Sequence, residues 1–273
     1  MTLIQVKKIV FSAIMAIVAV MCFLPFYMMI IMGTYDTPNL YTNLNVLPGD
    51  LWLYNPVYIF KSGFLLYYRN SFTVSSLVTI LSITFSMAAG YAFAKYRFIG
   101  NKQLFIFVML TMMIPYQISL VGFLIQMRAF GWIGTLLPLI LPPTASAFGV
   151  FWMRQYAISF VPTEILESAR IDGSNEFRTF FTIVIPMSRA AMFTLGILAF
   201  SGSWNSYLVP LVVISNDNLN TITLAVSKLS SMFFNDYAKQ ICALTIGTIP
   251  ILCIFATGSK YFIRGLSAGA IKG

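Results

Sequence analysis

Side chains able to perform covalent or acid–base chemistry are scarce in this chain. It has no histidine, so the commonest general base, proton relay and metal ligand is missing. The three cysteines, Cys22, Cys242 and Cys253, lie in apolar stretches without a C-x-x-C pair, and we interpret them as small core residues. No acid or base falls deep inside an apolar stretch. The sequence therefore predicts neither a metal site, nor paired catalytic carboxylates, nor an ion-coupling site within the membrane.

A nucleotide-binding loop is also absent from the sequence. Such a loop follows the pattern G-x-x-x-x-G-K-[ST]. The nearest match is Gly258-Ser259-Lys260-Tyr261, where a serine separates the glycine from the lysine, Cys253 stands five residues before Gly258 in place of the first glycine, and Tyr261 follows the lysine in place of Ser/Thr. We expect that this chain is not an enzyme and that it binds no cofactor of its own. Active transport by it would need energy from another polypeptide.

The composition is that of a protein embedded in lipid. Hydrophobic residues make up 59% of the 273 residues and charged residues only 9%, with a mean hydropathy of +0.83. A soluble domain carries about 25% charged residues. So few charges cannot cover a water-facing globule, which indicates an integral membrane protein.

Six apolar windows are long enough to cross a bilayer, which needs about 20 residues per helix. Backbone groups in lipid must be satisfied within their own segment, so each window is expected to be a helix. The prediction is an all-α, polytopic membrane protein, with one transmembrane domain over residues 1–273 and helices at about 9–33, 70–94, 103–127, 131–153, 190–214 and 241–262.

The distribution of basic residues predicts the orientation. With six spans, twelve Lys and Arg residues, beginning with Lys7 and Lys8, lie on the side of the N-terminus, and five lie on the other side. Positive residues concentrate on the cytoplasmic side, so both termini are expected in the cytoplasm of a cell membrane. The same distribution accounts for the net charge of +9 without a nucleic-acid partner.

A charged, helix-forming segment over 162–186 interrupts the apolar pattern. Thr163 is expected to cap a helix with Glu164 in its first turn, and Glu167 and Arg170 lie within reach at i,i+3. An apolar stripe follows one face of this helix, formed by Ile165, Leu166, Ala169 and Gly173.

A turn at 172–174 is predicted to follow this helix. Gly173 suits a left-handed residue after its C-terminus. Ser174 is expected to cap a second short helix with three phenylalanines on its apolar face, and Pro186 to end it. On physics alone, the segment could equally be an interfacial connector between two spans.

The spacing within this segment resembles a known signature. Residues 167–169 (E-S-A), Gly173 and 183–186 (I-V-I-P) are similar to the E-A-A…G…I-x-L-P pattern of bacterial ABC-importer permeases, with Ser168 and Ile185 as mild departures. Five further stretches look like the maltose-type carbohydrate permeases, specifically the second, six-helix permease of such systems: 69–71, 92–95, 148–155, 204–205 and 265–273.

The resemblance implies a role for the segment and a set of partners. It would be the cytoplasmic coupling loop, with its ATPase contacts at Glu164, Glu167, Ala169, Arg170, Asp172 and Gly173. The partners implied are a second, homologous permease, two ATPase subunits that bind ATP and Mg, an extracytoplasmic solute-binding protein and membrane lipid. The cargo implied is a sugar or oligosaccharide entering the cytoplasm.

A sugar path needs hydrogen-bonding groups and an aromatic face. Candidates within the predicted spans are Gln117, Trp204, Asn205 and Tyr207. The competing interpretation is that these groups bond between helices or anchor the chain at the interface. Three other functions remain open: import of another polar solute such as glycerol phosphate, a passive channel, and, disfavoured by the missing histidine, a membrane-embedded enzyme.

Overall fold

The computed structural model describes the backbone of residues 3–42, 45–232 and 236–270. Throughout these residues the chain is helical or irregular, with no strand. This confirms the all-α prediction. The elements are α1 (Leu3–Met32), η1 (Pro38–Leu40), α2 (Tyr54–Ile59), η2 (Phe60–Phe64), α3 (Leu65–Lys95), α4 (Asn101–Thr111), α5 (Tyr116–Ala129), α6 (Leu137–Thr144), α7 (Ala147–Phe160), α8 (Thr163–Ile171), α9 (Glu176–Thr179), η3 (Phe180–Val184), α10 (Ile185–Met187), α11 (Arg189–Trp204), α12 (Leu208–Val213), η4 (Asp217–Leu219), α13 (Ile222–Met232) and α14 (Tyr237–Ala270).

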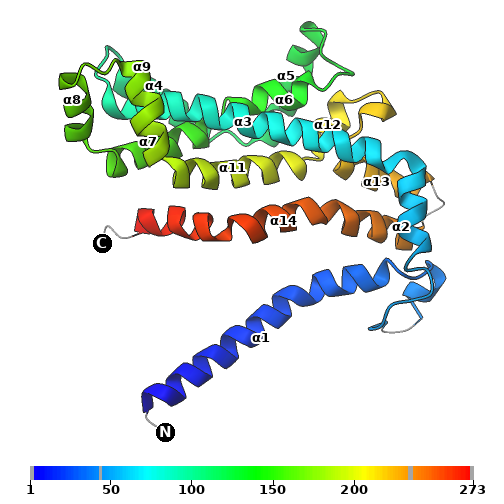
Figure 1. The fold of residues 1–273 in the computed structure, drawn as a ribbon. Helices are drawn as coiled ribbons and strands as arrows, with labels where there is room; N and C mark the ends of the chain where they lie inside the picture. Colours follow the sequence, from blue (N-terminus) through cyan, green and yellow to red (C-terminus); the bar gives the residue numbers. More distant parts are fainter. Residues whose placement is uncertain (1–2, 43–44, 233–235, 271–273) are drawn as a thin grey trace. The chain divides into compact units, whose positions relative to one another are not determined.

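The chain forms two compact units. Unit 1 comprises Met1–Leu65 and Ala225–Ile249, and unit 2 comprises Leu66–Leu224 and Pro250–Gly273. In unit 1, the buried Asn55 donates hydrogen bonds to the carbonyls of Gly33 and Tyr35, both at 2.9 Å, which ties α2 to the end of α1. The helices that form the charged segment and the cavity described below belong to unit 2 and are labelled in Figure 1.

Three helices among the described residues are long and apolar enough to cross a membrane: Ile4–Met32, Tyr54–Lys95 and Tyr237–Ser259. Two bent pairs raise the number to five if each pair is one span. One joins α4 to α5 with a bend of 99°, and the other joins Glu176–Met187 to α11 with a bend of 75°. The chain is therefore polytopic, and its predicted spans differ in how continuous they are.

Three windows predicted as unbroken helices are broken in the structure. The window 103–127 breaks between α4 and α5 because Pro115 cannot donate a backbone hydrogen bond and disfavours helix at the residue before it. The window 131–153 starts with Gly131 and Gly134 at positive φ, and it breaks again at Ala145 between α6 and α7. The window 190–214 breaks after Trp204, and Pro210 then falls in the first turn of α12, where its missing N–H is tolerated.

The core of unit 2 joins five of its helical elements. One buried cluster contains residues of α3, α7, α8, η3 and α11, together with Val161 just before α8: Met87, Tyr91, Met153, Ala157, Val161, Leu166, Val184, Ala191 and Leu195. Helices α3 and α7 meet at Gly90, where an added Cβ would lie 2.7 Å from the Cβ of Met153. The predicted coupling segment is thus packed into the body of the unit and does not hang from it.

Candidate functional site

The first helix of the charged segment is α8, and its two faces are different. Leu166 and Ala169 are buried at 2% and 7% exposure, whereas Ile165 stays 41% exposed. The predicted stripe is therefore divided: Leu166 and Ala169 pack against unit 2, and Ile165 remains on the surface. The charged residues predicted to meet an ATPase, namely Glu164, Glu167, Arg170 and Asp172, are all exposed, as is Gly173.

The N-terminus of α8 differs from the prediction. Thr163 is the first helical residue, and Pro162 occupies the capping position without a side-chain hydrogen bond. Proline fits this place because its φ is preset and its lack of an N–H costs nothing at a helix start. Glu164 in the first turn and Arg170 in the last turn both complement the helix dipole.

The C-terminus of α8 is a Schellman motif, as expected from Gly173. This residue has φ 78°, in the left-handed region. The N–H of Gly173 donates to the carbonyl of Arg170 at 3.0 Å, and the N–H of Ser174 donates to that of Ala169 at 2.9 Å. Nothing lies within 4 Å of a Cβ built on Gly173, so its requirement for glycine is conformational.

The second arm begins one residue later than predicted. Asn175 caps α9: its Oδ1 accepts a hydrogen bond from the N–H of Arg178 at 2.8 Å. Ser174, the predicted cap, accepts from the hydroxyl of Thr179 at 3.0 Å instead. Pro186 lies within α10 and does not end the helical run, since the bend follows at the junction with α11.

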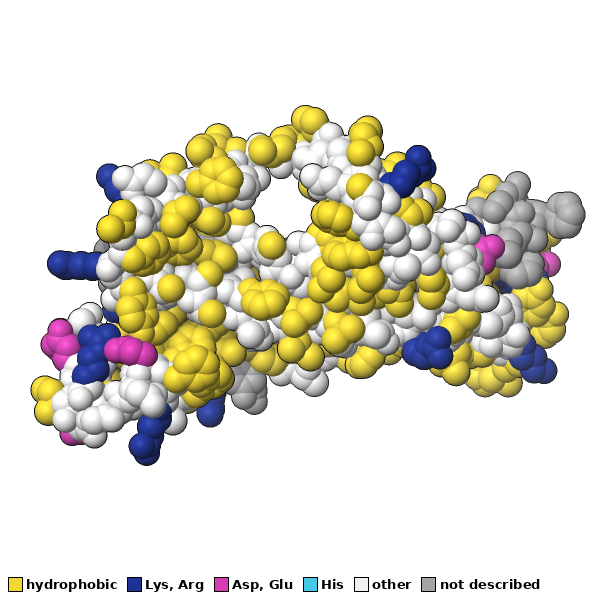
Figure 2. Space-filling view, turned by 90° about the horizontal axis from the view of Figure 1, so that it is seen from above, with side chains coloured by type: hydrophobic (Ala, Val, Ile, Leu, Met, Phe, Trp, Pro, Cys, Tyr) yellow, Lys and Arg dark blue, Asp and Glu magenta, His cyan; other side chains and the backbone are white. Residues whose placement is uncertain are grey.

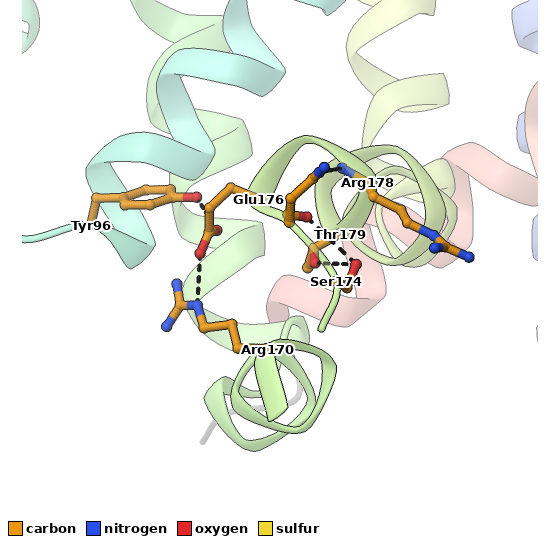
Figure 3. A network of polar contacts seen from close by, with 7 residues as sticks. Tyr96, Arg170, Ser174, Glu176, Arg178 and Thr179 are labelled. Atoms are coloured by element: carbon orange, nitrogen blue, oxygen red, sulfur yellow. Dashed lines mark hydrogen bonds and ion pairs between the residues drawn. The ribbon is translucent and has the colours of Figure 1, made fainter. Parts of the chain in front are cut away.

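An ion pair joins the two arms of the segment. Nε of Arg170 donates to Oε1 of Glu176 at 2.7 Å, and the hydroxyl of Tyr96 donates to the other carboxylate oxygen (Figure 3). From the sequence, Arg170 was predicted to lie within reach of Glu167. In the structure it pairs instead with Glu176, on the other side of the turn. The hydrogen bond from Arg170, followed by that from Tyr96, holds the pKa of the Glu176 carboxyl below its usual value.

The surface around this segment is mixed in character. At the end of unit 2 that carries α8 and α9, Figure 2 shows acidic and basic side chains together, and the adjoining surface is mostly hydrophobic. Two exposed phenylalanines of the second arm, Phe177 and Phe181, contribute to the hydrophobic part, with exposures of 76% and 54%. A charged patch beside an apolar one suits a segment that lies at a membrane surface and contacts a protein.

A cavity of about 640 Å³ lies elsewhere in unit 2. This volume is in the range of small-molecule sites, about 300–1,000 Å³. Its lining comes from α3, α6, α11 and α12, the start of α5 and of α7, the breaks after Trp204 and Ala145, and Thr221 before α13. The polar groups on its lining are all uncharged: Ser82, Tyr116, Ser146, Ser203, Asn205, Ser206, Tyr207 and Thr221.

Breaks between helices supply half of these polar groups. Asn205, Ser206 and Tyr207 form the break between α11 and α12, and Ser146 caps α7 by accepting from the N–H of Gly149 at 2.9 Å. Irregular backbone at membrane depth is tolerated where it lines a cavity or is buried in protein. The breaks that were not predicted from the sequence thus contribute polar groups to the cavity.

Two of the four predicted path residues line the cavity, Asn205 and Tyr207. Trp204 does not, because it is only 2% exposed and stacks on Phe200 with ring centroids 5.5 Å apart. Gln117 is exposed on α5 and is not in the lining, although its neighbour Tyr116 is.

Thr221 is a lining residue that the sequence analysis missed. It is 4% exposed, and its hydroxyl has no hydrogen-bond partner within the described part of the chain. A buried hydroxyl without a partner costs about 1–3 kcal/mol of stability. Its only signal in the sequence is a place in a short polar stretch, 215–221, between apolar windows.

Apolar spans, an uncharged cavity and a charged helical hairpin together define a membrane transport protein. Residues 82–263 match the family described as the binding-protein-dependent transport system inner membrane component, and the chain belongs to this family. It is a multi-pass permease subunit of an ABC importer and thus a transport component.

Relatives and a solved structure agree with this assignment. The chain is 33% identical to the arabinooligosaccharides transport system permease protein AraQ of Halalkalibacterium halodurans, over 83% of this chain and 81% of that protein. It is 30% identical to the sn-glycerol-3-phosphate transport system permease protein UgpE of Pectobacterium atrosepticum, over 94% of this chain and 95% of that protein. A chain from the crystal structure of a bacterial ABC transporter that imports the acidic polysaccharide alginate has the same fold, with a TM-score of 0.79, 20% identity and coverage of 94% and 97%.

Proposed function

We propose that this chain forms part of the path by which an ATP-driven importer moves a neutral sugar or oligosaccharide into the cytoplasm. The observation that carries this proposal is the chemistry of the cavity. Its polar lining consists of hydroxyls and one amide, with two tyrosine rings, and includes the unpartnered hydroxyl of Thr221. Sugars offer hydroxyls that donate and accept, and apolar faces that pack on aromatic rings.

The cavity favours a neutral cargo over a phosphate ester. Phosphates are recognised by arginine, lysine or helix N-termini, whose positive charge complements theirs. The residues that line the cavity include neither arginine nor lysine. The N-termini of α5 and α7 do reach the lining, at Tyr116 and Ser146, but a helix N-terminus carries only a partial positive charge. Glycerol phosphate, which a relative's name suggests, is therefore the second candidate cargo.

Energy would come from separate subunits. ATP and Mg would bind to two ATPase subunits that dock on the exposed side of α8, the side with Glu164, Glu167 and Gly173. A second, homologous permease would complete the path, and a solute-binding protein would deliver the sugar from the other side. The family's dependence on a binding protein supports the last of these partners. This arrangement places α8, α9 and both chain termini in the cytoplasm.

Uptake by the reconstituted importer tests the cargo. The complex that co-purifies with this chain is placed in proteoliposomes, with its binding protein outside, and is offered arabino-oligosaccharide, lactose or sn-glycerol 3-phosphate. We expect ATP-dependent uptake of a sugar and none of the phosphate ester. Uptake of the phosphate ester alone would refute the neutral cargo, and flux without ATP would support the passive channel.

Variants of the cavity sharpen this test. Thr221→Val and Asn205→Ala each remove a hydrogen-bonding group from the lining and should lower sugar uptake severalfold. Thr111→Val is the matched control, because the hydroxyl of Thr111 is exposed, bonds to the carbonyl of Val108 within its own helix and lies outside the cavity. Equal uptake by all three variants would show that this cavity is not on the path.

A further inference from the structure

Tyr96 stands where three elements meet. It directly follows α3, and its hydroxyl donates to the Glu176 carboxylate, which also binds Arg170 of α8 (Figure 3). One carboxylate at the start of α9 therefore holds the end of α3 and the last turn of α8 together. We call these three residues, Tyr96, Arg170 and Glu176, the carboxylate clamp.

The position of Tyr96 is fixed from both sides. Its N–H donates to the carbonyl of Ala92 in the last turn of α3, and its carbonyl accepts from the amide of Asn101 at 2.9 Å. Its ring packs edge-on against that of Tyr91, with centroids 5.5 Å apart. The backbone of Tyr96 is thus held at the end of α3, so movement of the loop alone would stretch the bond between Tyr96 and Glu176.

Helix α3 connects the clamp to the cavity. The same helix that ends beside Tyr96 contributes Val74, Val78 and Ser82 to the cavity lining. At 1.5 Å per residue, Ser82 lies about 21 Å along the helix from Tyr96. An unbroken helix can transmit a displacement over that distance. The pairs α4–α5 and α6–α7 are interrupted and are therefore less suited to do so.

Apolar packing alone does not set the orientation of α8. Leu166 anchors the helix in the core of unit 2, but hydrophobic contacts are non-directional and allow a helix to roll about them. The clamp adds a hydrogen bond from Arg170 of α8 to the Glu176 carboxylate, and a second bond, from Tyr96, holds that carboxylate. Such bonds are directional and stronger than neutral ones.

We propose that Tyr96 is a positioning residue for energy coupling. Its bond to Glu176 fixes the hairpin of α8 and α9 to the end of α3, so that displacement of α8 by an ATPase moves the wall of the cavity. This inference rests on the proposed function, because it assigns a transmission element to the coupling between ATPase and path. It predicts a residue whose loss separates ATP consumption from transport without detaching the ATPase.

The test is the ratio of sugar transported to ATP hydrolysed by the reconstituted complex, with arabino-oligosaccharide as the probe. Tyr96→Phe removes only the hydroxyl, and we expect the ratio to fall roughly three- to tenfold, in line with the net contribution of one ordinary hydrogen bond, because solvent screens the exposed carboxylate. Glu176→Gln should lower it at least as much. The double variant should be no worse than Glu176→Gln alone, because both changes break the same unit.

Tyr27→Phe is the matched control. The Tyr27 hydroxyl donates to the carbonyl of Val46 at 2.6 Å, in unit 1 and outside the clamp, so this variant should keep the original ratio. An unchanged ratio in Tyr96→Phe and Glu176→Gln would overturn the inference. So would loss of the co-purifying ATPase in these variants, since that would make the clamp a docking surface. If the unsubstituted complex shows no ATP-dependent uptake of any sugar, the proposed function itself fails.

Discussion

A Cβ atom on Gly90 of α3 would lie 2.7 Å from the backbone nitrogen of Arg154 in α7. Real Cβ atoms do not approach a backbone that closely, so the two helices meet here only because residue 90 has no side chain. The contact lies six residues before Tyr96. It joins α7, which leads into α8, to the helix that lines the cavity.

Gly90→Ala should therefore push α3 and α7 apart. We expect a loss of stability of about 1–3 kcal/mol, the usual result of overpacking. The matched control is Gly122→Ala, because nothing lies within 4 Å of a Cβ at that position. Alanine there should be neutral or stabilise α5 by about 0.5–1 kcal/mol. Thermal unfolding of the purified protein in detergent measures both, and equal midpoints would contradict the close contact.

Trp204 and Tyr207 are expected to separate stability from transport. Trp204 is buried against Phe200 and Tyr68, so Trp204→Ala should cost about 3–5 kcal/mol of stability. Tyr207 lines the cavity and is 37% exposed, so Tyr207→Ala should raise the sugar concentration needed for half-maximal uptake and leave the unfolding midpoint nearly unchanged. The two predictions are contradicted if Tyr207→Ala lowers the unfolding midpoint and Trp204→Ala changes sugar uptake without lowering that midpoint.

The carboxylate clamp should be insensitive to pH in the physiological range. The pKa of Glu176 is lowered by its bonds from Arg170 and Tyr96, so its stabilising contribution is complete above the ordinary value of 4.5 and is lost only as pH falls through the lowered value. Glu176 also raises the pKa of Arg170, and burial followed by the bond to Glu176 raises that of Tyr96. The sugar-to-ATP ratio should be flat from about pH 5.5 to 8.5. A step in the ratio that Glu176→Gln abolishes would contradict this.

The orientation predicts which residues react with a membrane-impermeant thiol reagent. Asn218 lies in the exposed turn η4, and Arg178 is exposed in α9. Asn218→Cys should be labelled from outside intact cells, and Arg178→Cys only after the cells are opened. The unsubstituted protein, with Cys22, Cys242 and Cys253, supplies the background. Labelling of position 178 in intact cells would reverse the topology and remove α8 from the reach of a cytoplasmic ATPase.

Patterns that depend on local chemistry predicted the structure well. Composition gave the membrane class, and Gly173 indicated the left-handed turn, since few other residues adopt that conformation readily. The helix–turn–helix form of the coupling segment followed from the same turn. These features need only a few neighbouring residues to be recognised.

Features that depend on tertiary contacts could not be predicted. The window 190–214 looks continuous by hydropathy, although it breaks after Trp204 beside the cavity. The break at Pro115 does have a local signal, the proline itself, which hydropathy does not detect. Arg170 has two acids within reach in the sequence, and only packing of α9 beside α3 selects Glu176. Nothing in the sequence indicated that Trp204 would be buried among aromatic rings. Nothing indicated that Thr221 would line the cavity.

Gly173 offers a graded test of the coupling segment. Its φ of 78° costs a residue with a Cβ about 1 kcal/mol, and asparagine tolerates this region better than alanine. Uptake should therefore decline from glycine through asparagine to alanine, although nothing in this chain clashes with the added Cβ.

ATP-dependent sugar uptake by the Gly173→Asp complex tests the central claim most directly. Aspartate adds both the strained Cβ and a negative charge on the exposed surface where α8 would meet the ATPase. We predict normal insertion of this chain in the membrane, with uptake lost and ATP hydrolysis no longer stimulated by sugar. Uptake at the rate of the unsubstituted complex would show that the segment over 162–186 is a connector, and would contradict its role in coupling.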